Sequence, residues 1–375
     1  MVKDIFANQF LINLFLLITL IIILIFLLDV IFLKLYKVIK KSSYIFIKKV
    51  PIKNIFFESH PYLPYVIKKK IICEKRIVNY PLNNIQAPKL VSNEKGFFNG
   101  ENGNKRVVIP KPKNLIRINC IGASTTGNYI EENNKIYSYP LELERILKKK
   151  YPKKKIEVNN FGIGGYNSAD ILISSILSQI DTKPNYVIIY HAYNDIRSYL
   201  TGNFSSDYSH SRENLAQNLN KIKNISWLPD LPISFYNFII NKFFVGTDLR
   251  NSIHNIISKG KVNIHNDYKE GLKIYERNMN NLINIYKSSG CDVVICKFCF
   301  YFHKKIKNDK IHRAYKKIVF KENIINKNLA KKFHIKFVNT DYLLKNSKEN
   351  FLDTIHFSVI GMRRLARLIA NSIKI

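Results

Sequence analysis

The feature that most constrains the fold is a regular alternation of strand-like and helix-like segments from residue 115 to the C-terminus. Short apolar runs typical of buried strands lie at 115–121, 156–160, 186–191, 292–298 and 335–338. Helical patterns lie between or after them at 139–150, 169–179, 268–287, 314–332 and 359–372. Such alternation predicts parallel strands joined by helices that cover both faces of one sheet.

The first of these strands ends at Gly122, and Ser124 follows almost directly. Ligands of open α/β sheets bind at the carboxyl ends of the strands, so a serine at this position is a candidate nucleophile. It needs a base, an orienting acid and oxyanion donors around it. The simpler interpretation, a helix-capping or turn serine, is common after a strand.

Three further segments supply candidate partners. Residues 160–165 end the second strand, 191–195 end the third, and Asp353 and His356 precede the last helix. These blocks resemble those of the SGNH (GDSL-type) hydrolases, which carry Ser, Gly, Asn and a D-x-x-H pair in this order. The resemblance extends from about Arg117 to the C-terminus. It implies a flavodoxin-like, three-layer α/β/α hydrolase fold with a parallel sheet.

Two positions depart from the family pattern. Ala123 replaces the usual Asp of G-D-S, and Ala192 replaces the Gly of G-x-N-D. The serine also lacks the G-x-S-x-G pattern of the α/β-hydrolases, because Thr126 stands where the last glycine belongs. The pattern therefore favours the SGNH type.

The resemblance assigns roles to individual residues. Ser124 is the expected nucleophile, His356 the general base and Asp353 the acid that orients its imidazole. The expected oxyanion hole consists of the Ser124 and Gly165 backbone N–H groups and the Asn194 side-chain amide. The alternatives are a capping aspartate, a solvated histidine and turn glycines. Asp195 is expected to anchor its loop rather than to react.

The N-terminal region, 1–40, is predicted to be a membrane anchor. Phe10 to Leu28 is an uncharged apolar stretch long enough to cross a bilayer as one helix. No small-residue cleavage site follows, which favours an uncleaved, single-pass anchor. Lysines after the span favour a cytoplasmic C-terminal side, whereas anchored relatives often act outside the cytoplasm. The side that carries the hydrolase therefore stays open.

The remaining chain divides into two predicted parts. Residues 41–112 contain repeated Pro, Asn and Gly residues between short apolar runs, which predicts a linker and an irregular leader packed on the domain. Residues 113–375 read as the hydrolase domain. Residues 198–266 fit the alternation poorly and form a cap-like insertion that would lie over the active-site end.

The charge distribution and the cysteine spacing indicate which kinds of ligand the chain is not expected to bind. The net charge of +33 is scattered along the whole chain, which indicates a compositional bias and not a nucleic-acid site. Cys296 and Cys299 would point to opposite faces of a strand, and no second pair accompanies them. The sequence therefore predicts no metal site and no cofactor.

The leading hypothesis is a membrane-anchored serine esterase that hydrolyses O-acyl esters, such as acetyl groups on cell-envelope carbohydrate. Its expected partners are a small-molecule or carbohydrate ester and the membrane. One alternative is an O-acyltransferase acting on surface polysaccharide. The other is a non-catalytic carbohydrate-binding or scaffolding protein that retains the SGNH fold. The sequence makes no prediction of oligomeric state.

Overall fold

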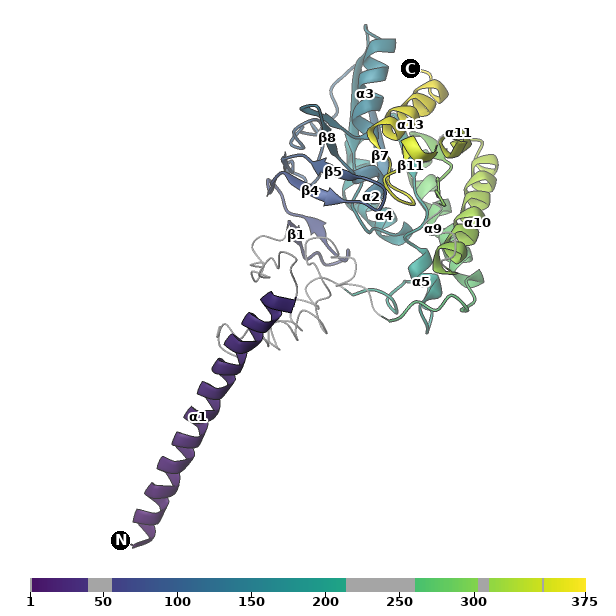
Figure 1. Ribbon diagram of the computed structural model, residues 1–375. Coiled ribbons are helices and arrows are strands. Elements are labelled where there is room, and N and C mark those ends of the chain that lie inside the picture. Colours follow the sequence, from purple (N-terminus) through teal and green to yellow (C-terminus); the bar gives the residue numbers. More distant parts are fainter. Residues whose placement is uncertain (1, 40–55, 214–259, 303–309, 346) are drawn as a thin grey trace. The chain divides into compact units, whose positions relative to one another are not determined.

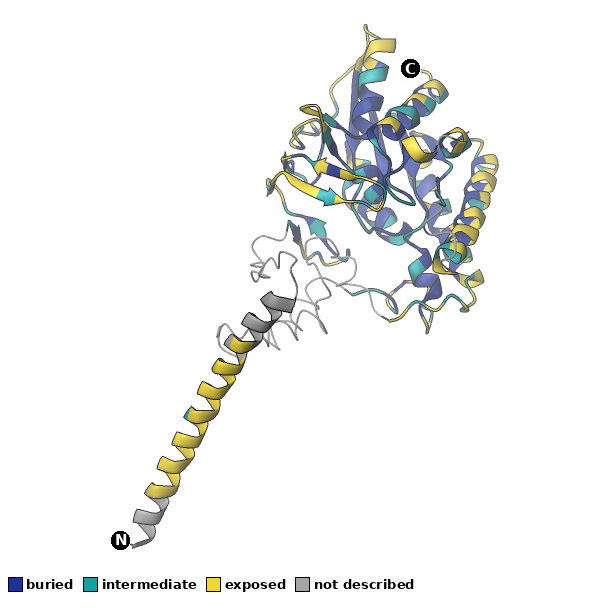
Figure 2. Cartoon of the chain, viewed as in Figure 1, coloured by how far each residue is buried: buried dark blue, intermediate teal, exposed yellow. Residues whose placement is uncertain are grey.

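The computed structural model describes residues 2–39, 56–213, 260–302, 310–345 and 347–375. These residues fall into two compact units, one containing helix α1 and the other beginning at Phe56. Helix α1 runs over Val2–Ile39. Its segment Gln9–Leu28 has a mean hydropathy of 3.3, and none of its residues is buried (Figure 2). The segment is long and apolar enough to cross a bilayer.

The second unit is built around a five-stranded parallel sheet (Figure 1). Its strands are β7 (Leu115–Gly122), β10 (Lys155–Asn160), β11 (Tyr186–Tyr190), β12 (Asp292–Cys296) and β13 (Lys336–Val338). Their order in the sheet is β10-β7-β11-β12-β13, with every pair parallel. This is the flavodoxin-like order. The predicted α/β class, the parallel sheet and the flavodoxin-like arrangement are therefore confirmed.

Helices cover both faces of this sheet and complete the three layers. Helices α3 (Tyr139–Lys150) and α13 (Val359–Ser372) pack together on one face. Helices α4 (Ser168–Ser174), α9 (Lys269–Ser288) and α10 (Lys310–Lys332) pack on the other. Short helices α2 (Ser124–Gly127), α5 (Ile196–Leu200), α11 (Asp341–Lys345) and α12 (Ser347–Asn350) occupy connections.

The helix predicted at 169–179 is α-helical only in its first part. An Asn167–Asp170 capping box starts α4. The backbone then widens into a π-helical turn over Ser175–Gln179 and ends in a 3-10 turn over Ile180–Thr182. This region packs against α9, and the buried Gln179 side chain donates to Ser174 Oγ at 2.9 Å. Such turns depend on packing that no local pattern reveals.

One face of the central strands is polar although it is fully buried. Arg117 and Asn119 of β7 are both 0 % exposed and pair in register with Glu157 and Asn159 of β10. The Arg117 side chain donates to Glu157 Oε1 at 2.7 Å, to the Thr182 carbonyl at 2.5 Å and to the Val108 carbonyl at 2.9 Å. The leader thus supplies one of the acceptors that the Arg117 side chain requires, because buried donors need partners.

The leader carries short strands from residue 57 on. Strand β1 (Phe57–Glu58) pairs with β2 (Val66–Ile67), and β3 (Ile72–Cys73) pairs with β6 (Leu90–Val91). Strands β4 (Arg76–Asn79) and β5 (Asn84–Ala87) join β8 (Ile130–Glu132) and β9 (Lys135–Tyr137) in an antiparallel sheet. Because β8 and β9 follow α2, the leader is hydrogen-bonded to the hydrolase region itself.

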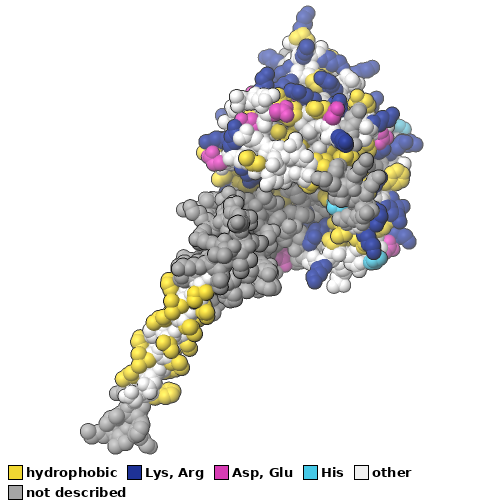
Figure 3. Space-filling view, in the orientation of Figure 1, with side chains coloured by type: hydrophobic (Ala, Val, Ile, Leu, Met, Phe, Trp, Pro, Cys, Tyr) yellow, Lys and Arg dark blue, Asp and Glu magenta, His cyan; other side chains and the backbone are white. Residues whose placement is uncertain are grey.

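Most of the predicted cap-like insertion, residues 214–259, lies outside the described residues. Its two flanks meet at a β-bridge between Thr201 and Val262. On the described surface, Lys and Arg side chains are spread over the visible face and interleaved with acidic and uncharged groups (Figure 3).

The buried Arg117 generates a stability prediction. We expect Arg117→Leu to lower the free energy of unfolding by about 3–5 kcal/mol, because it leaves the Glu157 carboxylate without its charge partner. Urea unfolding followed by circular dichroism measures this change. The control Arg367→Leu, at an exposed position of α13, should change it by less than about 0.5 kcal/mol. Equal stabilities of the two variants would contradict this account of the polar face.

Candidate active site

The candidate residues come from four connections at one edge of the sheet. Ser124 opens α2 directly after β7, Gly165 follows β10, and Asn194 follows β11. Asp353 and His356 lie in the turn before α13. Strands β7 and β11 are neighbours, and the chain runs from β7 outward to β10 before it returns to β11. Their carboxyl ends therefore form the switch point at which ligands of this fold class bind.

The structure brings Ser124, His356 and Asp353 into one hydrogen-bonded chain. His356 Nε2 lies 3.0 Å from Ser124 Oγ, and His356 Nδ1 lies 2.7 Å from Asp353 Oδ2. The His356 and Asp353 side chains are 17 % and 18 % exposed. With Nδ1–H donating to the carboxylate, Nε2 presents its lone pair to the serine hydroxyl. This is the arrangement that activates a serine nucleophile.

The turn that carries His356 is organised by the aspartate itself. Asp353 Oδ1 accepts hydrogen bonds from the backbone N–H groups of Ile355, at 2.8 Å, and His356, at 2.7 Å. Burial alone would raise the pKa of the Asp353 carboxyl, but the His356 charge and these hydrogen bonds lower it below its ordinary value. The carboxylate therefore stays charged through the neutral range and holds the imidazole.

Glycines of the second block allow the loop after β10 to lie against α2. A Cβ at Gly162 would stand 2.2 Å from the Gly127 nitrogen, so only glycine fits this approach. A Cβ at Gly164 would lie 3.8 Å from Ser124 Cβ, which places this loop beside the candidate nucleophile. Gly165 has a φ of +80°, in the left-handed region that favours glycine.

The three candidate oxyanion donors come from three connections at this edge of the sheet. Asn194 Nδ2 donates to the Tyr166 carbonyl at 2.8 Å, which uses one of its two amide hydrogens. The Gly165 carbonyl accepts a hydrogen bond from Arg212 Nη1 at 3.1 Å. The Ser124 N–H is the first of α2 and has no partner within the helix. All three groups thus border the same edge of the sheet.

At both departures from the family pattern, the alanine carbonyl accepts backbone hydrogen bonds. The Ala123 carbonyl accepts from the Thr126 N–H at 3.0 Å and the Gly127 N–H at 2.9 Å, closing the turn of α2. The Ala192 carbonyl accepts from the Asn194 N–H at 3.0 Å. Both alanine side chains are buried. Asp195, which follows Asn194, is fully buried and accepts from the Ser168 N–H at 3.0 Å.

Sequence reasoning missed several residues that contact these groups. The Tyr80 ring, from the leader, has its centroid 5.3 Å from that of His356. The Tyr65 hydroxyl donates to the Gly164 carbonyl, and the Tyr166 hydroxyl donates to the Tyr65 carbonyl. Arg212, from the start of the insertion, pairs with Asp170 at 2.7 Å. Tyr65, Tyr80 and Arg212 lie outside the four motif blocks, so no local signal could identify them.

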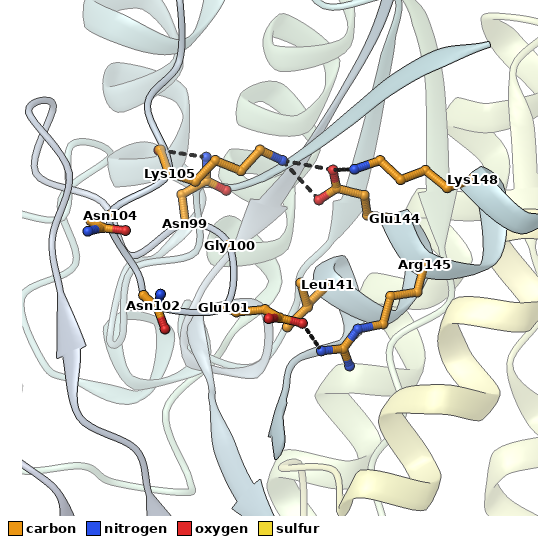
Figure 4. A pocket seen from close by; sticks show the side chains of 10 residues that line it. All are labelled: Asn99, Gly100, Glu101, Asn102, Asn104, Lys105, Leu141, Glu144, Arg145 and Lys148. Atoms are coloured by element: carbon orange, nitrogen blue, oxygen red, sulfur yellow. Dashed lines mark hydrogen bonds and ion pairs between the residues drawn. The ribbon is translucent and has the colours of Figure 1, made fainter. Parts of the chain in front are cut away.

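A surface hollow lies between the 99–105 loop and α3 (Figure 4). Its charged side chains pair with one another: Lys105 Nζ lies 2.9 Å from Glu144 Oε2, and Lys148 Nζ lies 2.7 Å from Glu144 Oε1. No residue of the Ser124–His356–Asp353 chain lines this hollow. Within the described part of the chain, no group of three or more His, Cys, Asp or Glu could hold a metal ion.

Residues 118–369 match the family model for the GDSL-like lipase/acylhydrolases. The chain therefore belongs to this family, and it is an ester-hydrolysing enzyme of the SGNH type. No curated protein matches the sequence significantly.

Solved structures similar to this chain include three esterases or hydrolases. The acetylxylan esterase Axe2 from Geobacillus stearothermophilus is 17 % identical, with 69 % of this chain and 94 % of that chain covered and a TM-score of 0.42. The acetyl xylan esterase AlAXEase is 15 % identical, with 69 % and 100 % covered and a TM-score of 0.42. LAE5, an alpha/beta hydrolase from the metagenome of Lake Arreo, Spain, is 13 % identical, with 68 % and 94 % covered and a TM-score of 0.41.

The Asp353 geometry generates a catalytic prediction. In Asp353→Asn, the amide oxygen can still accept from Ile355 and His356, so its NH₂ group would donate to His356 Nδ1. That tautomer places a proton on Nε2, where a lone pair is required. We expect kcat for p-nitrophenyl acetate to fall by about 10⁴-fold without a change in melting temperature.

The matched control for this prediction is Asp207→Asn. Asp207 Oδ1 likewise accepts a backbone hydrogen bond, from Ser209 at 2.9 Å, and also one from the Ser205 hydroxyl at 2.7 Å. Its substitution should leave turnover unchanged. Turnover of Asp353→Asn at the wild-type level would exclude Asp353 as the orienting acid.

Proposed function

We propose that the protein is a serine esterase in which Ser124, His356 and Asp353 act as the catalytic triad. The observation that carries this proposal is the continuous hydrogen-bonded chain from Asp353 through His356 to Ser124 Oγ. It joins segments far apart in the sequence at the ligand-binding edge of the sheet. A structural role alone would not require a histidine base between a hydroxyl and a charged carboxylate.

In the proposed first step, Ser124 Oγ attacks the ester carbonyl carbon while His356 Nε2 takes the hydroxyl proton. Asp353 stabilises the resulting imidazolium. The tetrahedral intermediate then expels the alcohol oxygen, which receives the proton from His356. In the second step His356 removes a proton from water, the hydroxide oxygen attacks the acyl-enzyme, and the carboxylic acid leaves as Ser124 regains its proton.

The negative charge of each intermediate would be stabilised by the Ser124 and Gly165 backbone N–H groups and the Asn194 amide. Support for these roles is the position of Gly164 beside Ser124 and the bond from Asn194 to Tyr166 in the same loop. Such donors act chiefly on the developing oxyanion, and the loss of one typically lowers kcat by about 10²–10³-fold.

The proposed substrate is an O-acyl ester, with acetylated cell-envelope carbohydrate as the specific hypothesis. Two features support it: family membership and the apolar helix α1, which we propose to be a single-pass membrane anchor. An anchor would hold the domain beside envelope material. The same acyl-enzyme could transfer its acyl group to a sugar hydroxyl instead of water, which is the acyltransferase variant of the proposal.

The nucleophile assignment leads to a direct prediction. Wild-type protein should hydrolyse p-nitrophenyl acetate and react with a fluorophosphonate probe at Ser124. Ser124→Ala should abolish both signals, because no other group would form the acyl-enzyme. The control Ser178→Ala, at a half-buried serine bonded to the Ser174 carbonyl, should retain both. Probe labelling at a different serine would refute the assignment, and acetyl transfer to an added sugar acceptor would favour the acyltransferase variant.

The anchor assignment predicts how the protein fractionates. Full-length protein should stay with membranes after carbonate and high-salt washes, because an apolar span and not surface charge would hold it. A variant that lacks residues 2–39 should appear in the soluble fraction. Immunoblotting of the fractions measures both. Release of the full-length protein by salt alone would contradict the proposed span.

A further inference from the structure

The backbone just before Asn194 adopts a strained turn. Tyr193 has a φ of +81°, and the Asn194 N–H donates to the Ala192 carbonyl at 3.0 Å, closing a three-residue γ-turn. A bulky aromatic residue rarely adopts this conformation, because it is sterically strained. The surrounding structure must therefore hold the turn in place.

The contacts that hold the turn come from α10 and its neighbourhood. The Tyr193 N–H donates to Glu322 Oε2 at 3.2 Å, and the Tyr199 hydroxyl donates to Glu322 Oε1 at 2.9 Å. Glu322 is 0 % exposed. The Tyr193 ring packs against Phe300 and Tyr315, with centroid distances of 6.0 and 5.3 Å. A buried carboxyl group and two aromatic rings thus contact the strained residue Tyr193.

We propose that Glu322 is a positioning residue for ester hydrolysis, which holds the Tyr193 turn so that the Asn194 amide faces the oxyanion. This inference rests on the proposed role of Asn194. Because Asn194 is the last residue of the turn, a change of Tyr193 to negative φ would redirect the amide. Glu322 acts from behind the loop and would not touch the substrate.

The chemical state of Glu322 suits this task. Burial and the nearby Asp195 charge raise the pKa of Glu322 to about 8, which favours the neutral carboxyl group. Glutamine is therefore a close substitute, since it keeps a neutral shape and a carbonyl acceptor. Leucine keeps the volume but offers no acceptor to Tyr193.

The test uses full-length protein in detergent with p-nitrophenyl acetate as substrate. We expect Glu322→Leu to lower kcat by about 10–100-fold with little change in KM, because misplaced catalytic groups lose transition-state contacts. Glu322→Gln should stay within about threefold of wild type. The control Lys321→Leu, at the exposed neighbouring position of α10, should leave kcat unchanged.

Two combined variants separate positioning from general destabilisation. Adding Glu322→Leu to Asn194→Ala should cost almost nothing, because both changes disable one unit. Adding it to Tyr193→Gly should also cost little, since glycine adopts positive φ without strain. Full additivity in both backgrounds, or wild-type kcat in Glu322→Leu, would overturn the proposal.

Hydrogen–deuterium exchange of the backbone distinguishes failure of this inference from failure of the proposed function. Glu322→Leu should raise exchange at the Tyr193 amide, a result that does not depend on catalysis. Unchanged exchange would refute the positioning role of Glu322 even if Ser124 proves to be the nucleophile. If the wild type is inactive and Glu322→Leu still exchanges faster at Tyr193, the positioning role of Glu322 stands and the esterase mechanism is refuted. If Glu322→Leu does not fold, Glu322→Met, which keeps an unbranched chain without an acceptor oxygen for the Tyr193 N–H, provides the same comparison.

Discussion

The pairing of β7 between β10 and β11 determines where the candidate catalytic groups lie. Asn160 pairs with Cys120, and Tyr190 pairs with Gly122, so the three strands end at nearly the same level. The side chains on the two faces of the strands fix this register, since a slip by one residue would turn every buried side chain to the opposite face. The loops that carry Ser124, Gly165 and Asn194 therefore leave the sheet together.

His356 lies near the C-terminus of the chain, far from Ser124 in the sequence. Helix α13 packs on α3, and the turn before α13 places His356 against Ser124. The leader then adds a further layer, with Tyr80 against the His356 ring and Tyr65 bonded to the Gly164 carbonyl. Residues before the region that matches the family model thus contribute to the surroundings of the site. Catalytic geometry depends on groups held by such neighbours, because small displacements are costly.

Buried polar groups do much of this positioning. Arg117 joins β7 to β10, to the turn before β11 and to the leader, while Glu322 joins α10 to the loop after β11. Each lies in a place where an unpaired group would be expensive, so its partners are strongly specified. The strained residue Tyr193 lies in the loop that carries Asn194, and such strained residues are common near functional sites.

The sequence by itself determined the alternation of strands and helices, the order of the four motif blocks and the apolar N-terminal span. These features are local: periodicity within a segment reports which face is buried, and glycines mark close approaches such as that of Gly162 to α2. Only the tertiary structure decided the contacts of Tyr80, Arg212 and Glu322. In the sequence, Glu322 is one charged residue in an amphipathic helix, and Tyr193 gives no sign of positive φ. Their contacts join segments distant in the chain, and such contacts arise from packing that no local pattern encodes.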